Sequence, residues 1–67
     1  MSAPKITPRE KEIITWLSYG KTTDDICGIL ACKKFTVETH KRNIMDKMGV
    51  PNVTAMVASA LRQGLVE

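Results

Sequence analysis

Helix start and stop signals divide this sequence into four short segments. Thr7-Pro8-Arg9-Glu10 has the pattern of a capping box, with proline at the first helical position and a glutamate that can bond back to the Thr7 amide. Thr22 and Asp25 form a shorter box, and Asn52 is a favourable N-cap residue. Residues that stop helices follow three segments, at Gly20, Gly49, Pro51 and Gly64. These signals predict helices over about 8–19, 23–31, 35–48 and 53–63, and hence an all-α fold.

A chain of 67 residues has room for one domain with a small core. Apolar residues make up 43%, an ordinary globular share, and no run approaches the ~20 residues of a membrane helix. We expect residues 1–5 to be a flexible N-terminal segment and residues 6–67 to form the domain, a four-helix bundle. Cys27, Cys32 and His40 are too few for a four-ligand structural zinc site. We therefore expect reduced thiols, no metal or cofactor, and a cytoplasmic location.

The third segment is amphipathic and is the most informative of the four. At about 100° per residue, its apolar side chains fall on one stripe and its polar side chains on the opposite face. The stripe consists of Val37, His40, Ile44 and Met48, and the polar face of Glu38, Thr39, Arg42 and Asp46. Together with the short second segment and the turn of residues 31–34, this pattern predicts a helix-turn-helix. A helix seated on its apolar stripe can present its outer face to the DNA major groove, which is ~12 Å wide and admits one helix.

The net charge of +3 is concentrated around this third segment. Residues 1–32 and 48–67 each balance to zero, whereas residues 33–47 hold five basic side chains against two acidic ones. A basic segment on a neutral body predicts one face for a polyanion such as duplex DNA, although a merely solvated helix face has the same composition.

Several short motifs, in their order and spacing, make the stretch from Ile6 to Val66 resemble the DNA-binding domain of LuxR-type (GerE-like) transcription regulators. They are Thr7-Pro8-Arg9-Glu10, Gly20, Thr22 with Asp25-Ile26, Thr36-Val37 with His40, Asn43-Ile44, Lys47-Met48-Gly49-Val50, and Asn52 with Thr54-Ala55. The resemblance implies a four-helix domain whose third helix enters the major groove and whose fourth helix dimerises on DNA. Such a domain is usually the C-terminal output of a longer regulator, whose upstream part is a receiver domain or an acyl-homoserine lactone pocket.

The resemblance places the family's base-facing positions on Glu38, Thr39 and Arg42. Arg42 can bind guanine O6 and N7 with two bonds, or contact a phosphate instead. Thr39 can donate to a base edge or pack its methyl group on thymine. Glu38 can accept from cytosine N4 or, four residues before Arg42, orient that guanidinium through an intrahelical pair. Phe35 stands where the family is usually polar, and its ring either touches a thymine methyl or packs back on the first helix.

The remaining polar side chains of the basic segment are expected at the DNA backbone. The predicted phosphate contacts are Lys33, Lys34, Thr36, Lys41, Asn43 and Lys47. Lys41 lies beside the apolar stripe, so its stem can cover the core while its amine reaches out, and Asn43 can instead cap a neighbouring loop. Lys33 stands where the family caps the third helix with Ser or Thr, so this helix start lacks its usual acceptor. Gly28 weakens the second helix, which suggests that another helix approaches it closely.

The fourth segment has an apolar stripe that is wide for a helix at the edge of a small domain, so part of it can face another molecule. The predicted dimer interface consists of Val53, Met56, Val57, Ala60 and Leu61. The leading hypothesis is a sequence-specific DNA-binding domain of a transcription regulator that acts as a homodimer on a pseudo-palindromic site. The alternative is a protein–protein docking module that uses this stripe. An enzyme is not expected, because His40 lies on the inward stripe without a nucleophile and a positioned acid beside it.

Overall fold

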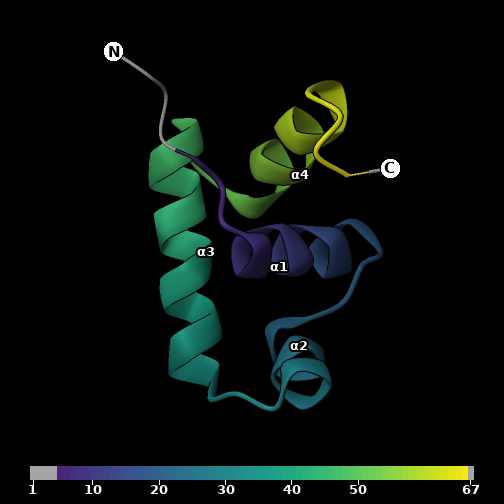
Figure 1. Ribbon diagram of the computed structural model, residues 1–67, viewed down its shortest axis with the longest axis vertical. Helices are drawn as coiled ribbons and strands as arrows, with labels where there is room; N and C mark the ends of the chain where they lie inside the picture. The colour runs from purple at the N-terminus through teal and green to yellow at the C-terminus, as the bar shows by residue number, and fades with distance from the viewer. Residues whose placement is uncertain (1–4, 67) are drawn as a thin grey trace.

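The computed structural model describes residues 5–66, which form four helices and no strand (Figure 1). The helices are α1 (Pro8–Ser18), α2 (Thr23–Leu30), α3 (Lys34–Met48) and α4 (Val53–Arg62). Their bounds agree with the expected segments to within one residue, so the all-α fold is confirmed. Of the N-terminal segment expected over residues 1–5, only Lys5 lies within the described residues. No helix in this part of the chain has both the length and the apolar character to cross a membrane.

Side-chain caps begin three of the four helices as expected. Thr7 Oγ1 accepts from the Glu10 N–H at 3.1 Å, and Glu10 Oε1 accepts from the Thr7 N–H at 2.8 Å. Thr22 and Asp25 repeat this capping box at 3.1 and 3.0 Å. Asn52 Oδ1 accepts from the amide three residues later at 2.8 Å. Each of these bonds satisfies an amide that the start of a helix leaves unpaired.

Three residues in α2 and at its junction with α3 are unfavourable for the conformation found at their positions. Lys33 is the N-cap residue of α3 and makes no side-chain cap bond. Ala31 ends α2 with φ +54°, a left-handed conformation that glycine usually adopts at this position. Gly28 lies in α2 with no atom within 4 Å of the place where a Cβ would stand, so the close helix approach expected there is wrong. Packing of α2 and α3 on the core therefore holds a junction that local preferences do not specify.

The longest helix, α3, has the other three helices packed against one side of it (Figure 1). The largest fully buried side chains, which join the four helices, are Ile13, Ile14, Ile26, Val37, Ile44 and Met56. Burial of each such side chain contributes about 1.5–3 kcal/mol to folding. Since the core lies wholly on one side of α3, the opposite side of this helix remains open to solvent.

The apolar stripe of α4 is divided between the core and the surface. Met56 and Ala60 are fully buried among the core residues. Their assignment to a dimer interface is therefore wrong, because the body of the domain already covers them. Val53 and Val57 are half-buried, and Leu61 is 47% exposed. Only these three members of the predicted interface can contact another molecule.

Candidate nucleic-acid interface

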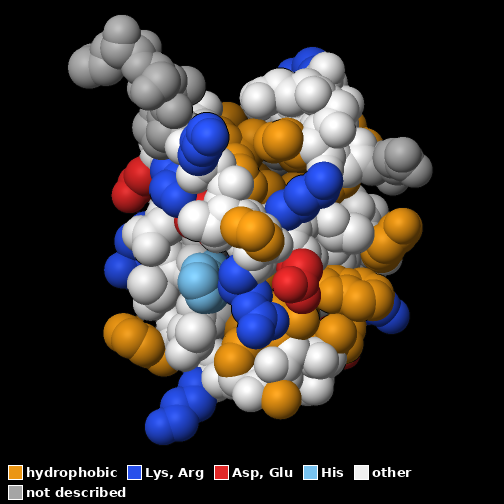
Figure 2. Space-filling view, in the orientation of Figure 1, with side chains coloured by type: hydrophobic (Ala, Val, Ile, Leu, Met, Phe, Trp, Pro, Cys, Tyr) orange, Lys and Arg blue, Asp and Glu red, His pale blue; other side chains and the backbone are white. Residues whose placement is uncertain are grey.

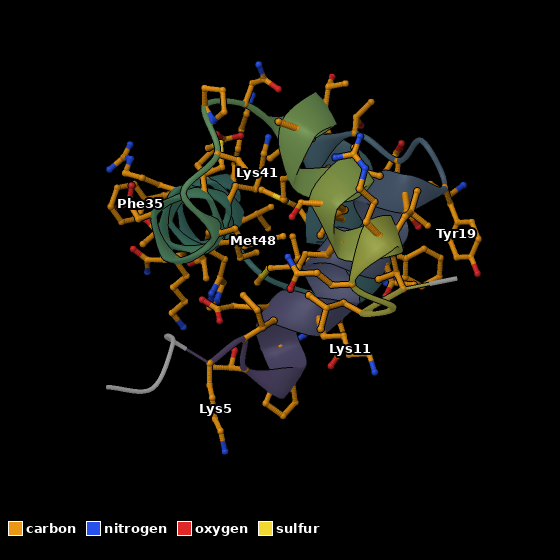
Figure 3. The ribbon with its side chains drawn as sticks, turned by 90° about the horizontal axis from the view of Figure 1, so that it is seen from above. Lys5, Lys11, Tyr19, Phe35, Lys41 and Met48 are labelled. Atoms are coloured by element: carbon orange, nitrogen blue, oxygen red, sulfur yellow. The ribbon has the colours of Figure 1, made fainter. Side chains whose placement is uncertain are left out.

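The open side of α3 carries a row of three side chains, Phe35, Thr39 and Arg42. Phe35 and Arg42 are seven residues apart and so lie only about 20° apart around the helix, opposite the buried Val37 and Ile44. Phe35 is 79% exposed. Figure 3 shows its ring pointing away from the body of the molecule, so the expected packing on α1 is wrong. We call Phe35, Thr39 and Arg42 the outer row.

Within the outer row, Arg42 is the side chain with most unused hydrogen-bonding capacity. No residue between positions 5 and 66 forms a hydrogen bond or an ion pair with its guanidinium, whose donors therefore face solvent. Thr39 Oγ1 instead donates to the Phe35 carbonyl at 2.9 Å. Because that hydroxyl proton is already used, Thr39 has its methyl group and the lone pairs of its hydroxyl oxygen left for a ligand.

Glu38 is turned toward α2 and away from the outer row. Its Oε1 accepts from Thr23 Oγ1 at 2.8 Å and from Lys41 Nζ at 3.5 Å, and Lys41 Nζ also donates to Thr23 Oγ1 at 3.0 Å. The hydrogen bond from Thr23 lowers the pKa of Glu38 despite an opposing effect of burial, and the charge of Lys41 adds to this. Of the two alternatives for Glu38, the intrahelical pair with Arg42 does not form, since its partners are Thr23 and Lys41. The Lys41 side chain is only 15% exposed, so its stem is covered as expected.

Lys47 is bound to the start of α1 and to the segment before it. Its Nζ lies 2.7 Å from Glu10 Oε1 and 3.0 Å from the Lys5 carbonyl oxygen. Glu10 is only 3% exposed. Burial alone would raise the pKa of Glu10, but the bonds from Lys47 and from the Thr7 amide bring it below its usual value. The phosphate contact expected for Lys47 stays a prediction, and the ammonium would have to make it while also paired with a buried carboxylate.

The other predicted phosphate contacts lie on the surface beside the outer row. They are Lys33, Lys34, Thr36 and Asn43, all of them exposed. Lys34 lies 3.7 Å from Asp24, but both side chains are more than half exposed, so this pair is weak and leaves the ammonium available. Figure 2 shows basic side chains along the edge of the molecule formed by α3, with a hydrophobic side chain among them.

The exposed part of α4 borders a groove of about 390 Å³ between α4 and α1. The groove is lined by Leu17, Val53, Thr54, Val57, Ala58 and Leu61. Three of these residues belong to the predicted dimer interface. Leu17 was not among them, because its spacing in the first segment is that of an ordinary core residue. Only the packing of α1 against α4 places it at this surface.

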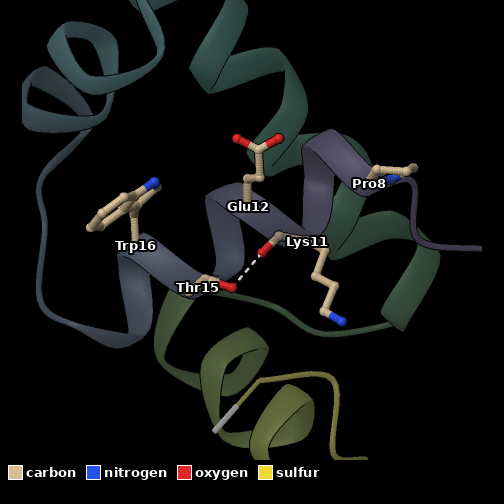
Figure 4. Close-up of a pocket in the computed structure, with 5 residues that line it drawn as sticks. All are labelled: Pro8, Lys11, Glu12, Thr15 and Trp16. Carbon is tan, nitrogen blue, oxygen red and sulfur yellow. Dashed lines mark hydrogen bonds between the residues drawn. The ribbon is translucent and has the colours of Figure 1, made fainter.

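A second hollow lies on the exposed face of α1. Its lining residues are Pro8, Lys11, Glu12, Thr15 and Trp16 (Figure 4). The Lys11 ammonium and the Glu12 carboxylate point away from one another, and the Thr15 hydroxyl donates to the Lys11 carbonyl at 2.8 Å. A ligand site needs polar groups that converge on one point. This hollow therefore carries no site of its own, and the outer row remains the candidate.

The fold and the outer row together define a helix-turn-helix DNA-binding domain of the kind used by transcription regulators. The model of the family described as bacterial regulatory proteins, luxR family (GerE), matches residues 4–60. The chain belongs to this family. LuxR-type domains bind DNA and occur in regulators with separate receiver or ligand-binding domains.

Known relatives are mostly much longer than this chain. The uncharacterized response regulatory protein YgeK of Escherichia coli (strain K12) is 39% identical over 61 residues, which is 91% of this chain and 42% of YgeK. The regulatory protein SdiA of the same strain is 40% identical over 58 residues, or 87% of this chain and 24% of SdiA. The solved structure of the transcription factor GerE superposes with a TM-score of 0.88 at 31% identity, covering 100% of this chain and 97% of that one. The chain thus spans less than half of YgeK and about a quarter of SdiA.

Proposed function

We propose that this chain binds duplex DNA in a sequence-specific manner, as the output domain of a transcription regulator that acts in the cytoplasm. In this proposal α3 enters the major groove with the outer row toward the bases. The observation that carries it is the exposed Arg42 guanidinium, without a partner among residues 5–66, on the face of α3 opposite the core. An arginine in this position can bind guanine O6 and N7 with two bonds, the commonest specific contact in the major groove.

The other base contacts follow from the directions of the side chains. Thr39 offers its methyl group to thymine, since its hydroxyl is bonded to the helix backbone. Glu38 uses Oε1 for Thr23 and Lys41, which leaves Oε2 to accept from cytosine N4 at the flank of the helix. These contacts supply specificity, whereas contacts to the DNA backbone supply position. For the backbone we propose Lys33, Lys34, Thr36 and Asn43, with Lys41 reaching a phosphate only if it leaves Thr23.

Two alanine substitutions test this division of roles. Arg42→Ala should reduce discrimination at one G·C pair per half-site by about 5- to 150-fold, equivalent to about 1–3 kcal/mol. Lys34→Ala should weaken binding to all DNA sequences alike. It should also make the slope of log affinity against log salt concentration shallower by about one unit per copy. Binding of both variants is measured by mobility shift on specific and scrambled duplexes over a range of salt concentrations. Uniform weakening by both variants contradicts the division, and binding that is insensitive to salt contradicts DNA binding by this face.

We further propose that the groove between α1 and α4 receives a second copy of this chain. The groove is apolar and Leu61 stands 47% exposed at its edge, so a two-fold contact would bury the same patch on both copies. Two copies of α3 held in this way would read half-sites about one helical turn apart, ~10 bp. The site would then be pseudo-palindromic.

The interface proposal is tested with two matched substitutions, each of which adds one negative charge. Leu61→Glu should abolish the dimeric complex on DNA and leave the monomer folded, because this side chain is outside the core. Gln63→Glu adds the same charge beyond the groove and should leave the dimer unchanged. Stoichiometry is measured by sedimentation with a two-half-site duplex. If Leu61→Glu still binds as a dimer, the groove is not the interface. If the chain self-associates but shifts no DNA, the docking module is the correct function.

The length of the relatives supports a regulatory domain elsewhere in the intact regulator. The relatives include a response regulatory protein, and VjbR of Brucella is a quorum sensing-dependent transcriptional regulator. A receiver domain or an acyl-homoserine lactone pocket upstream of this domain would control access of α3 to DNA.

A further inference from the structure

Phe35 is the most exposed large apolar side chain in the described part of the chain. It is 79% exposed, compared with 64% for Tyr19 and 47% for Leu61. An aromatic ring in water forgoes the favourable free energy of burial, which for Phe is among the largest of any side chain. Neither the core nor a neighbouring helix covers the ring, so any stabilising contact it makes is with a partner.

The position of Phe35 identifies where that partner lies. The residue is in the first turn of α3, in line with Thr39 and Arg42 and opposite the core. In helix-turn-helix domains the N-terminal residues of the recognition helix contact the base edges. Glu38, the nearest acidic side chain on α3, is held by Thr23 and turned away from this row. The ring and the Thr39 methyl therefore form a small apolar surface next to a guanidinium.

The chemistry of the major groove limits what such a surface can recognise. The base edges there present hydrogen-bond donors and acceptors and one apolar feature, the C5-methyl group of thymine. We propose that Phe35 reads a pyrimidine 5-methyl group in each half-site. The inference rests on the proposed function and adds a specificity-determining residue to it. 5-Methylcytosine presents the same methyl group, so the preference extends to a methylated cytosine in the same place.

The experiment uses duplexes that differ by one methyl group. Sites bound by the chain are selected from random duplex DNA, and each thymine of the selected site is then replaced by deoxyuridine. In each half-site, deoxyuridine at the thymine beside Thr39 should lower affinity through loss of that contact. Deoxyuridine at a second thymine, beside Phe35, should lower affinity about fourfold, which corresponds to about 0.8 kcal/mol for one buried methyl group. A cytosine at that position should bind about fourfold better when it carries a 5-methyl group. The first comparison measures the contribution of the thymine methyl group to affinity, and the second measures that of the methyl group on 5-methylcytosine.

Variants assign the effect to the ring. Phe35→Ala should bind the thymine and deoxyuridine duplexes equally at the position beside Phe35 while keeping the preference at the thymine beside Thr39, and Phe35→Leu should keep part of the preference at the first position. Tyr19→Ala removes another exposed aromatic ring, on the side of the domain away from α3, and should leave the preference unchanged. Melting curves from circular dichroism should coincide for Phe35→Ala and the unchanged chain, because the ring is outside the core.

The outcomes separate this inference from the proposed function. If the chain selects a specific site but tolerates deoxyuridine at the position beside Phe35, Phe35 does not read a methyl group and the proposed function stands. If Phe35→Ala keeps the preference at every sensitive thymine, other residues read the methyl groups and the inference is wrong. If no duplex is bound specifically, both are wrong.

Discussion

The ion pair between Lys47 and Glu10 gives the sharpest test of how this domain is held together. Glu10 Oε1 accepts from Lys47 Nζ at 2.7 Å and from the Thr7 amide at 2.8 Å. The Glu10 side chain is only 4% exposed, whereas the Lys47 side chain is 27% exposed. Lys47→Met keeps most of the stem and removes the charge, so it leaves a buried carboxylate with one remaining donor.

The structure sets the size of the expected loss. Removing one partner of a fully buried pair costs about 3–5 kcal/mol, because the other charge is left without compensation. Since water reaches Lys47, we expect a smaller loss, about 2–3 kcal/mol in the free energy of unfolding. For a domain of this length, that corresponds to a fall in Tm of about 10–20 °C. Combining Glu10→Gln with Lys47→Met should recover part of the loss, because Gln can still accept from the Thr7 amide and is uncharged.

The pH dependence follows from the direction of the pKa shift. The pKa of Glu10 is lowered on folding, so its contribution to stability is present above the ordinary value of 4.5 and is lost as the pH falls through the folded value. In Lys47→Met, loss of the Lys47 hydrogen bond and charge raises that pKa above its value in the unchanged chain. The charged carboxylate then destabilises the variant at neutral pH, and protonation relieves it. The difference between the two proteins should therefore be largest near pH 7 and shrink toward pH 3.

A matched surface pair provides the control. Arg9 and Glu12 lie 3.8 Å apart with both side chains about half exposed, so Arg9→Met should cost less than about 1 kcal/mol. Stability is measured by urea unfolding, followed by circular dichroism, at pH 3, 5 and 7. If Lys47→Met costs no more than Arg9→Met at pH 7, or if its cost does not shrink with acid, the role given to the buried pair is wrong.

Two further substitutions test α2 and its junction with α3. Gly28→Ala should raise the free energy of unfolding by about 0.5–1 kcal/mol, because the position is helical, exposed and open around the missing Cβ; a loss in urea unfolding would mean that a hidden contact needs the glycine. Lys33→Ser supplies the missing N-cap of α3 and should add about 1 kcal/mol, while weakening DNA binding at low salt through loss of a cation. Thermal melting and mobility shift should thus move in opposite directions for Lys33→Ser.

The elements of this fold are predictable from sequence because their signals are local. The bonds of the capping boxes join residues three positions apart, at Thr7 and Glu10 and at Thr22 and Asp25. The outward direction of Arg42 likewise follows from helical periodicity within one segment, once the opposite stripe is known to be apolar. No knowledge of tertiary structure is needed for either inference.

Contacts between distant segments are what the sequence could not reveal. Lys47 and Glu10 are 37 positions apart, and Lys41 and Thr23 are 18 apart. Nothing in the sequence around these residues indicates that Lys47 pairs with the buried carboxylate of Glu10. Nor does it indicate that Lys41 bonds to Thr23 at the start of α2. The apolar stripe of α4 is ambiguous in the same way, because its width does not show which of its side chains pack on the other helices. Met56 is one of those that do, and it is fully buried in the core.

These distant contacts change what the basic segment can do. Counted along the chain, residues 33–47 appear to offer five cations to DNA, but Lys47 neutralises Glu10 and Lys41 is bound beside Glu38. Three exposed cations of this segment remain per copy, Lys33, Lys34 and Arg42. Contacts from such cations to phosphates position the helix but carry no sequence information, so discrimination among sequences has to come from the bases themselves. On α3 that work falls to the outer row, where a guanidinium, a methyl group and an unburied aromatic ring stand together.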